Sequence, residues 1–382
     1  MRFDSLVVGA GPAGCIAARD LARAGARVAI IDASHPREKA CGGGVTGRAL
    51  SAIGCERFHV LADAQSVRQA LFEVERHYAP VPIDSEDVLN VFPRAALDAQ
   101  LLADAVASGA VHLPARVLSF ERVAADWNVA TSRGPVAGSW LLGADGASGI
   151  VRKQVFRPFA RTQLSIAAGS FVDEATTTEI VIRFVDRPRG YLWSFPRPDH
   201  LAVGACARAD DTTTAELQAI CDRWLEGYAP ASGRRRRRYA WPIPSLSAAD
   251  FDHERPAGDG WMLLGDAAGL VDPITREGIF FALRSGSLAA AALAGEAPAR
   301  DYATALRNEI YPELKRAARL HDTLFRPRFT RLLLEGLTRS APIRRVMIDL
   351  IGGRQPYAGL KRRLIATGEL RLMVKLLLSS PF

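Results

Sequence analysis

The sequence is poor in cysteine and has no long apolar run, and these absences exclude several classes of protein. Its cysteines are too few and too scattered for a disulfide framework, so we expect reduced thiols in a cytoplasmic protein: Cys15, Cys41, Cys55, Cys206 and Cys221. No pair of them has metal-ligand spacing, so no metal site is expected. No apolar stretch is long enough to cross a bilayer, and a first strand beginning at residue 3 leaves no space for a signal peptide.

The net positive charge of the chain comes from its C-terminal part. From Arg300 to Phe382 there are 17 Lys and Arg against 7 Asp and Glu, whereas the residues before Arg300 are close to neutral. The same tail carries the apolar runs Leu332–Leu334 and Leu376–Leu378, and this combination favours the inner face of an anionic membrane or an acidic protein partner. An arginine-rich helical cap is the alternative. Nucleic acid is not expected, because no recognition motif accompanies the charge.

The first thirty residues carry the strongest local signal. A predicted strand at Leu6–Val8 is followed at once by a G-x-G-x-x-G motif made of Gly9, Gly11 and Gly14. A helix over Cys15–Ala24 and a second strand over Val28–Ile31 come next, and Asp32 ends that strand. The glycines permit a tight turn, a close approach of backbone N–H groups to a pyrophosphate, and tight helix packing, while the acid can bind a ribose. The motif predicts a dinucleotide site; a tight turn without a ligand is the alternative.

The order of the predicted elements indicates an α/β fold with an interrupted first domain. Alternating apolar runs in the middle of the chain are typical of an antiparallel sheet: Glu179–Val185, Tyr191–Phe195 and Leu201–Ala207. We therefore expect a Rossmann-type nucleotide-binding domain with an inserted α+β domain that binds the substrate, followed by a helical region. The predicted ranges are 1–55, 90–160 and 255–298 for the first domain, 56–89 and 161–254 for the second, and 299–382 for the helical region.

Five segments in this order resemble a known superfamily. The glycine motif with Asp32, then Arg94, Gly143-Ala144-Asp145-Gly146 and Gly265-Asp266 are similar to the fingerprints of FAD-dependent oxidoreductases of the aromatic-hydroxylase fold. Within it, Lys39-Ala40-Cys41-Gly42-Gly43, Tyr191-x-Trp193-x-Phe195-Pro196 and the loop GDAAGLVDPITREGI resemble the geranylgeranyl reductase family. The resemblance covers roughly residues 3 to 290.

The resemblance implies a set of residues that bind FAD. Asp266 is expected to accept a hydrogen bond from a ribityl hydroxyl, and the helix that starts at Gly278 is expected to point its positive end at the flavin N1/O2 edge. The expected contacts are Gly9, Gly11, Gly14, Asp32, Lys39, Cys41, Gly42, Gly43, Arg94, Asp145, Gly146, Gly265, Asp266, Gly278 and Ile279.

The chain departs from the family pattern at two positions. The family shows D-G-x-x-S-x-x-R, and here Gly149 replaces the serine whereas Arg152 is kept. The second flavin loop reads P-x-T-G-E-G in the family, and here Arg276 replaces its first glycine. We expect the side chain of Arg276 to point outward into solvent, or to lie near the flavin or the substrate.

The candidate catalytic residues are Cys41, Tyr191 and Trp193. Tyr191, Trp193 and Phe195 alternate along one strand and therefore share a face, either as an aromatic wall for an apolar substrate or as a sheet core. A proton donor is required, and Cys41, Tyr191 or a trapped water are the choices; Cys41 is otherwise a small packed residue. The five arginines of 234–238 hold a phosphate head group or form a solvated edge strand.

The resemblance implies reduction of carbon–carbon double bonds in a polyprenyl or geranylgeranyl-type lipid or a prenyl diphosphate, by hydride transfer from flavin N5. An FAD- and NAD(P)H-dependent monooxygenase acting on an aromatic or polyketide substrate is the alternative, and a carrier without catalysis is a third. Halogenation is disfavoured because flavin halogenases need a catalytic lysine between the first two nucleotide-binding segments. No lysine lies between Lys39 and Lys153. No second G-x-G-x-x-G follows a strand, so electrons are expected from transient NAD(P)H or from ferredoxin or flavodoxin docked on the basic tail.

Overall fold

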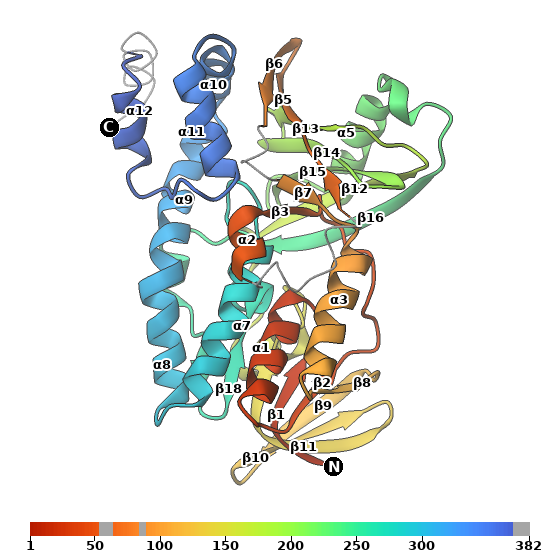
Figure 1. The fold of residues 1–382 in the computed structure, drawn as a ribbon, viewed down its shortest axis with the longest axis vertical. Helices are drawn as coiled ribbons and strands as arrows, with labels where there is room; N and C mark the ends of the chain where they lie inside the picture. The colour runs from red at the N-terminus through yellow and green to blue at the C-terminus, as the bar shows by residue number, and fades with distance from the viewer. Residues whose placement is uncertain (53–63, 84–88, 370–382) are drawn as a thin grey trace.

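The computed structural model describes residues 1–52, 64–83 and 89–369, and within them the strands form three sheets (Figure 1). The first sheet has a parallel core in the order β18-β11-β1-β2-β8, with β17, β10 and β9 added antiparallel. Its strands are β1 (Arg2–Val8), β2 (Val28–Ile31), β8 (Val111–Leu113), β9 (Val117–Val123), β10 (Asp126–Thr131), β11 (Gly134–Gly143), β17 (Ala257–Gly258) and β18 (Trp261–Leu263).

The parallel core is buried because helices cover it. All four residues of β2 are buried, as expected for a strand that is packed on both faces. The covering helices are α1 (Pro12–Arg23), α3 (Arg94–Ala107) and α7 (Ile279–Leu293). Helix α1 is rich in alanine, and a Cβ at Gly286 of α7 would lie 2.5 Å from the Ala13 carbonyl oxygen, so the two helices approach closely. This contact places the middle of α7 against the first turn of α1.

The second sheet has seven strands in the order β16-β12-β15-β14-β13-β5-β6, antiparallel except for the β13–β5 pair. Its strands are β5 (Gln69–Val74), β6 (His77–Pro82), β12 (Leu164–Asp173), β13 (Glu179–Val185), β14 (Gly190–Pro196), β15 (His200–Arg208) and β16 (Arg236–Pro244). Helix α5 (Thr214–Glu226) packs on one face through Leu217 and Cys221. A small third sheet contains β3 (Gly44–Thr46), β7 (Leu89–Val91) and β4 (Gln65–Ser66).

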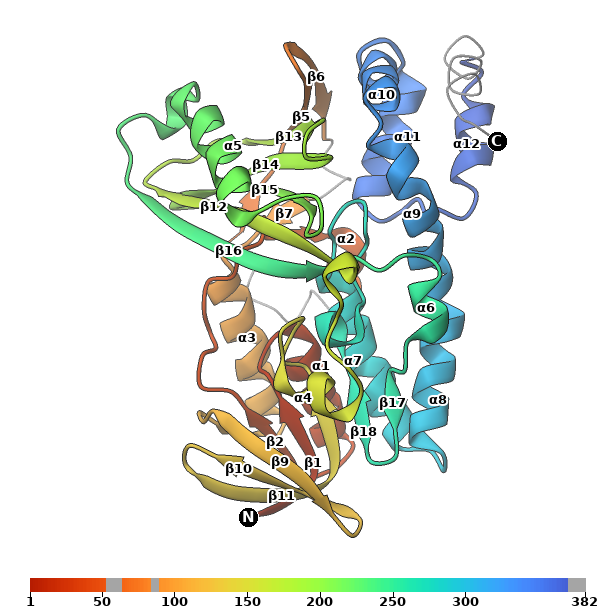
Figure 2. The ribbon, with the colours of Figure 1, turned by 180° about the vertical axis from the view of Figure 1, so that it is seen from behind.

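The remaining elements are helical. Figures 1 and 2 show the C-terminal helices running along the side of both large sheets, from α8 beside β18 to α10 and α11 beside β5 and β6. They are α8 (Pro298–Ala305), a π-helical turn (Leu306–Ile310), α9 (Tyr311–Leu324), α10 (Pro327–Arg339), α11 (Ala341–Ile351) and α12 (Leu360–Ala366). The short ones are α2 (Gly47–Ala52), α4 (Ile150–Val155) and α6 (Asp250–His253), with 3-10 turns at Arg161–Gln163, Ala229–Ala231 and Gly265–Ala268.

The predicted α/β fold, with its parallel sheet and C-terminal helical region, is confirmed. The first sheet draws on the stretches 2–31, 111–143 and 257–263, and the second on 69–82, 164–208 and 236–244. The domain ranges themselves stay a prediction. None of the helices in the described ranges combines the length and the apolar character needed to cross a bilayer. Cys55 and Leu376–Leu378 lie outside the described residues.

The arginine run lies at the edge of the second sheet, in agreement with the solvated edge strand, which was one of the two alternatives, and not with a phosphate site in a cavity. Each arginine pairs with an acidic side chain near the surface: Arg234 with Glu174, Arg235 and Arg237 with Asp173, and Arg236 and Arg238 with Asp222. None of the five lines either of the two cavities described below. An edge strand lined with charge resists pairing with other chains, which is the alternative interpretation of the run.

One ion pair lies fully inside the protein. The side chains of Arg152 and Glu254 are each 1% exposed and meet through two hydrogen bonds of 2.7 and 3.0 Å. Arg152 also donates to the Ala267 carbonyl and stacks on Phe159 at 3.5 Å. The pair therefore joins α4 to the chain segment around the 3-10 turn Gly265–Ala268.

We expect Glu254→Ala to lower the free energy of unfolding by about 3–5 kcal/mol, because it leaves the Arg152 charge buried and unpaired. Urea denaturation of the FAD-loaded protein measures the loss. The control is Glu309→Ala, which removes an exposed partner of Arg284 and should cost less than about 1 kcal/mol. Equal losses in the two variants would contradict the assignment.

Candidate functional site

The glycine motif forms a turn in which no larger residue fits at Gly9 or at Gly14. Gly9 has φ +107, and a Cβ there would overlap the Ala144 carbonyl; a Cβ at Gly14 would overlap the Gly9 carbonyl. At Gly11 the nearest atom to a Cβ would be 3.9 Å away, on His35, so this stretch of backbone faces open space. Helix α1 begins directly after it with no side-chain cap on its N–H groups. Unpaired N–H groups at the positive end of a helix are suited to a phosphate.

Asp32 lies at the end of β2 and holds the turn from the other side. Its carboxylate accepts hydrogen bonds from the Ala10 N–H at 2.9 Å, from Ser34, and from His35 Nδ1 at 2.7 Å. Burial favours the neutral acid, but these hydrogen bonds outweigh it and keep the pKa of Asp32 far below its usual value. The predicted ribose acceptor is therefore an anion at neutral pH.

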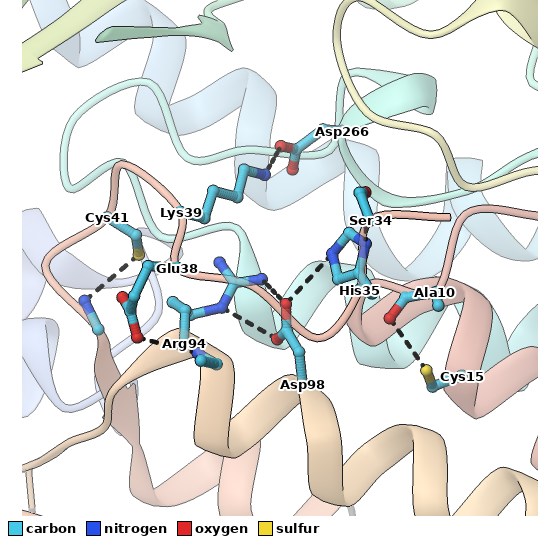
Figure 3. A network of polar contacts seen from close by, with 12 residues as sticks. Ala10, Cys15, Ser34, His35, Glu38, Lys39, Cys41, Arg94, Asp98 and Asp266 are labelled. Carbon is cyan, nitrogen blue, oxygen red and sulfur yellow. Dashed lines mark hydrogen bonds and ion pairs between the residues drawn. The ribbon is translucent and has the colours of Figure 1, made fainter. Parts of the chain in front are cut away.

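A chain of polar contacts continues from His35 into helix α3 (Figure 3). His35 Nε2 lies 3.4 Å from Asp98, and Arg94 donates two hydrogen bonds to the same carboxylate at 3.0 and 2.9 Å. Although burial acts against its charge, the Asp98 carboxylate raises the pKa of Arg94. The predicted cofactor contact Arg94 is thus a buried cation with a fixed orientation.

The Asp145–Gly146 turn closes the third side of the same space. Asp145 accepts a hydrogen bond from the Val151 N–H at 2.9 Å and so caps helix α4, while burial raises its pKa to about 6. Its other oxygen, Oδ1, is buried and has no hydrogen-bond partner among the described residues. A Cβ at Gly149 would overlap this carboxyl group, which explains the glycine in place of the family's serine.

These residues line a cavity of about 390 Å³, here called the glycine-loop cavity. It adjoins a second, largely apolar cavity of about 250 Å³, the aromatic cavity. Six residues line both: Pro12, Lys39, Arg94, Trp241, Asp266 and Ala282. The two cavities therefore form one elongated site between the two large sheets.

The loop that carries Lys39 to Gly43 is held from the second sheet. Arg197, which follows β14 and is fully buried, pairs with Glu38 and donates to the Cys41 carbonyl at 2.8 Å. A Cβ at Gly42 would lie 3.1 Å from the Phe195 ring, so the bare backbone packs first against a ring of the protein itself. The sulfur atom of Cys41 accepts a hydrogen bond from the Gly43 N–H at 3.3 Å, and Cys41 lines the aromatic cavity.

Lys39 and Asp266 meet where the cavities join. Their ion pair is 2.9 Å long and is only partly exposed (Figure 3). Helix α7 begins close by, after Gly278, again with no side-chain cap. Its neighbour Glu277 forms an ion pair with Arg48 and accepts a hydrogen bond from the Thr46 hydroxyl. The carboxylate next to the helix start is therefore already balanced by a cation. The N–H groups of α7 remain suited to negative charge on a ligand.

Tyr191, Trp193 and Phe195 all line the aromatic cavity, as one wall. On the neighbouring strand β15 they face small residues: Cys206, Gly204 and Ala202 respectively. A Cβ at Gly204 would overlap the Trp193 ring and lie 2.6 Å from the Tyr239 hydroxyl. The hollow thus exists because β15 is small where β14 is large. The Trp193 indole N–H is buried and has no partner among the described residues.

Tyr191 is poorly suited to give up a proton. Its hydroxyl donates to the Thr275 carbonyl at 3.0 Å, and burial raises its pKa well above the usual value. Tyr191 therefore ties β14 to the loop 272–278. On the other side of that loop, Asp272 accepts from the Ile274 N–H and from the hydroxyl of Tyr357 at 2.9 Å. The loop is held by the sheet and by the C-terminal helices together.

Most of the predicted cofactor residues line one or both cavities. The exception is Gly14, which is packed between α1 and β1. Sequence reasoning missed five residues that build the site: Glu38, Asp98, Arg197, Trp241 and Tyr357. Two of them had a usable signal: Arg197 directly follows the Phe195-Pro196 motif, and Asp98 lies four residues after Arg94 on a predicted helix. Glu38 and Tyr357 had none, because their partners Arg197 and Asp272 are distant in the chain.

The site fits FAD on three structural observations. A glycine cradle that a Cβ would fill lies at the uncapped start of α1. The orphaned Asp145 Oδ1 lies beside it as an unused acceptor. The cavity then continues past Lys39 and Asp266 into a space lined by apolar side chains, several of them aromatic. The glycine loop, Asp32 and Asp145 would hold the nucleotide half, and Lys39, Asp266 and the start of α7 the flavin half.

We expect Gly149→Ser to weaken FAD binding about tenfold and to destabilise the protein by about 1–3 kcal/mol. The new side chain displaces the Asp145 carboxylate and breaks the cap on Val151. Flavin release on dilution and thermal unfolding measure the two effects. Gly47→Ala is the matched control, since no atom lies within 4 Å of its new Cβ. Unchanged FAD affinity in Gly149→Ser would refute the role given to Asp145.

Comparisons with known proteins agree with this geometry. The family model described as an FAD binding domain matches residues 2–300. The menaquinone reductase of Mycolicibacterium smegmatis is 29% identical over 92% of this chain and 91% of that protein. The geranylgeranyl diphosphate reductase of Rhodobacter capsulatus is 29% identical over 76% and 75%. A geranylgeranyl bacteriochlorophyll reductase-like structure from Thermoplasma acidophilum has a TM-score of 0.80 at 21% identity and covers 96% of this chain and 99% of its own.

The first four-fifths of the chain match the FAD family, the fold is shared along nearly the whole length, and the cavities suit the cofactor. The chain therefore belongs to the family of proteins that carry this FAD binding domain, and its sequence is similar to that of a geranylgeranyl diphosphate reductase.

Proposed function

We propose that the protein reduces carbon–carbon double bonds of a polyprenyl lipid or prenyl diphosphate in the aromatic cavity. The observation that carries this proposal is the wall of that cavity beyond the flavin end. It is formed by branched and aromatic side chains from the second sheet and from α10 and α11: Phe72, Ile182, Phe184, Leu333, Met347 and Ile351. Burial of a hydrocarbon chain against such a wall stabilises binding by about 0.8 kcal/mol per methylene group. The relatives named for geranylgeranyl diphosphate and menaquinone support a lipid substrate.

When bound in reduced form, FAD supplies a hydride from N5 to one alkene carbon while a proton adds to the other, so the π bond is replaced by two C–H bonds and the flavin loses two electrons. The protein contributes position and exclusion of water. Trp193 and Phe195 shield the cavity on the sheet side, and the start of α7 provides N–H groups that stabilise negative charge.

We assign the proton to Cys41. Its sulfur accepts a hydrogen bond from Gly43, which leaves the thiol hydrogen free to point into the cavity that Cys41 lines. Tyr191 is disfavoured because its hydrogen is engaged by the Thr275 carbonyl. After transfer, the same Gly43 N–H would stabilise the thiolate until it is reprotonated.

The test is an anaerobic assay. The holoenzyme is photoreduced and mixed with geranylgeraniol and geranylgeranyl diphosphate, and we expect the flavin to reoxidise as the product gains two hydrogens per double bond by mass spectrometry. Cys41→Ala should slow this step about 100-fold while FAD remains bound. Starting the assay with NADPH, NADH or reduced ferredoxin instead of light tests our proposal that one of these supplies the electrons.

The matched control is Cys221→Ala, which removes a buried thiol of α5 that donates to the Ala168 carbonyl outside both cavities. Its rate should equal that of the unmodified protein. An oxygenated product in air, with no reduction of prenyl chains, would refute the proposed function. An unchanged rate in Cys41→Ala would assign the proton to water.

We also propose that the basic C-terminal helices dock on the inner face of an anionic membrane, from which a lipid substrate could enter. Helix α12 carries exposed Lys361 and Arg362 next to Ile365, which is 52% exposed. Exposed cations beside an exposed apolar side chain are suited to the lipid headgroup region.

We expect the protein to co-sediment with vesicles containing phosphatidylglycerol but not with neutral vesicles, and to be released by salt. The double variant Lys361→Glu/Arg362→Glu should bind at least about tenfold more weakly, at roughly 1 kcal/mol per basic residue. The control, Arg27→Glu/Arg133→Glu, makes the same charge change next to β2 and in the β10–β11 turn. Equal weakening in both variants would indicate that only net charge matters.

A further inference from the structure

Arg276 has a backbone conformation that its side chain disfavours. It lies in the loop between Asp272 and Gly278 with φ +59, in the left-handed region that glycine adopts freely. A residue with a Cβ is destabilised there, because the Cβ lies too close to the following carbonyl oxygen. The motif of the family that the chain resembles has glycine at this point, so the guanidinium is a departure from that pattern. The side chain points inward and lines the aromatic cavity.

The Arg276 guanidinium has no counter-charge in the described part of the chain. Its Nη1 donates to the hydroxyl of Ser245 at 2.6 Å, and its Nε is buried without a hydrogen-bond partner. The adjacent carboxylates are engaged elsewhere: Asp272 with the backbone of its own loop and with Tyr357, and Glu277 with Arg48.

The titratable side chains that face Arg276 from other elements are neutral at pH 7. Burial raises the pKa of Tyr191 and of Cys206, so the phenol and the thiol keep their protons. Burial and the Arg276 charge lower the pKa of His321 to about 4, so its imidazole is uncharged. The guanidinium therefore keeps one uncompensated positive charge.

The other two cations of the cavity show what a compensated charge looks like. Lys39 pairs with Asp266 and Arg94 with Asp98, at 2.9 Å in both cases. Arg276 is the one of these three for which the described residues provide no carboxylate. An unpaired cation beside an apolar wall is unfavourable, and a ligand with one negative charge would relieve it.

We propose that Arg276, held in place by Ser245, forms a subsite for an oxyanion of the substrate, so that the cavity selects a prenyl lipid with one negatively charged group, either a carboxylate or a phosphate ester. This proposal rests on the proposed function. Arg276 donates to the oxyanion from N–H groups that are not bonded to Ser245, and the Ser245 hydroxyl, which accepts from Nη1, fixes the orientation of the guanidinium. A neutral prenyl alcohol would leave the guanidinium unpaired and would bind more weakly.

The test compares three ligands with the same hydrocarbon chain: geranylgeranoic acid, geranylgeranyl monophosphate and geranylgeraniol. Each is titrated into the oxidised holoenzyme, and the shift of the flavin absorbance gives its dissociation constant. We expect at least one of the two anions to bind about tenfold or more tightly than the alcohol, the gain from one charge-assisted hydrogen-bonded pair. Comparison of the acid with the phosphate identifies which oxyanion the subsite takes.

Arg276→Gly should abolish the preference for the anion, and Arg276→Lys should retain part of it. The glycine variant suits the left-handed backbone, so its melting temperature should equal or exceed that of the unmodified protein, and loss of folding is excluded as an explanation. Arg237→Gln, on the exposed edge of β16 and outside both cavities, removes one positive charge and should leave the preference unchanged.

An unchanged preference in Arg276→Gly overturns the proposal. So does a shift of the flavin reduction potential in that variant with no change in ligand preference, because the guanidinium would then serve the cofactor. If the three ligands bind and are reduced equally well, the subsite is refuted and the proposed function stands. If none of them binds to the unmodified protein or is reduced by it, the proposed function fails as well.

Discussion

The structure depends on the contact of bare backbones at the carboxyl end of the parallel sheet. Gly9 touches the chain at Ala144, and Gly14 touches Gly9, at separations that exclude any side chain. This contact brings the uncapped start of α1 between Asp32 and Asp145, which come from two different strands of the sheet. A cofactor site results from geometry alone, because the N–H groups at this point have no other partner. Every other part of the site is placed relative to that junction.

Buried ion pairs attach the remaining parts to this junction. Arg197 holds the loop of Cys41 from the second sheet, and Arg152 with Glu254 holds the segment that leads to Asp266. Tyr357 extends the same principle to the C-terminal helices, since its hydroxyl supports the Asp272 loop. Removal of either partner of such a contact would leave a charge or a polar group buried without a hydrogen bond, which is costly. These contacts therefore favour this one arrangement of the segments over others. Of the three cations that line the aromatic cavity, Arg276 is the one for which the described residues provide no carboxylate.

The shape of the aromatic cavity follows from complementary side-chain volumes on adjacent strands. Large rings on β14 face Cys206, Gly204 and Ala202 on β15, so the rings lie down and leave a hollow above them. The α10 and α11 helices close the far end with Leu333 and Met347. The same sheet is packed by α5 on its other face, where Leu192 alternates with the cavity-facing rings. One strand therefore serves both the core and the site.

The sequence by itself determined the features that depend on neighbours within a few residues. The glycine spacing, the acid after β2, and the alternation of Tyr191 and Trp193 could be predicted from short-range backbone geometry. The departures at Gly149 and Arg276 followed from the family pattern that the chain resembles. Only the tertiary structure decided which distant groups meet: that the 234–238 arginines pair along a sheet edge, that Tyr191 gives its hydrogen to Thr275, and that Arg276 turns inward without a carboxylate. The physical reason is that these contacts form between different elements of the chain, 84 residues apart for Tyr191 and Thr275 and 31 for Arg276 and Ser245, and local spacing carries no information about such encounters.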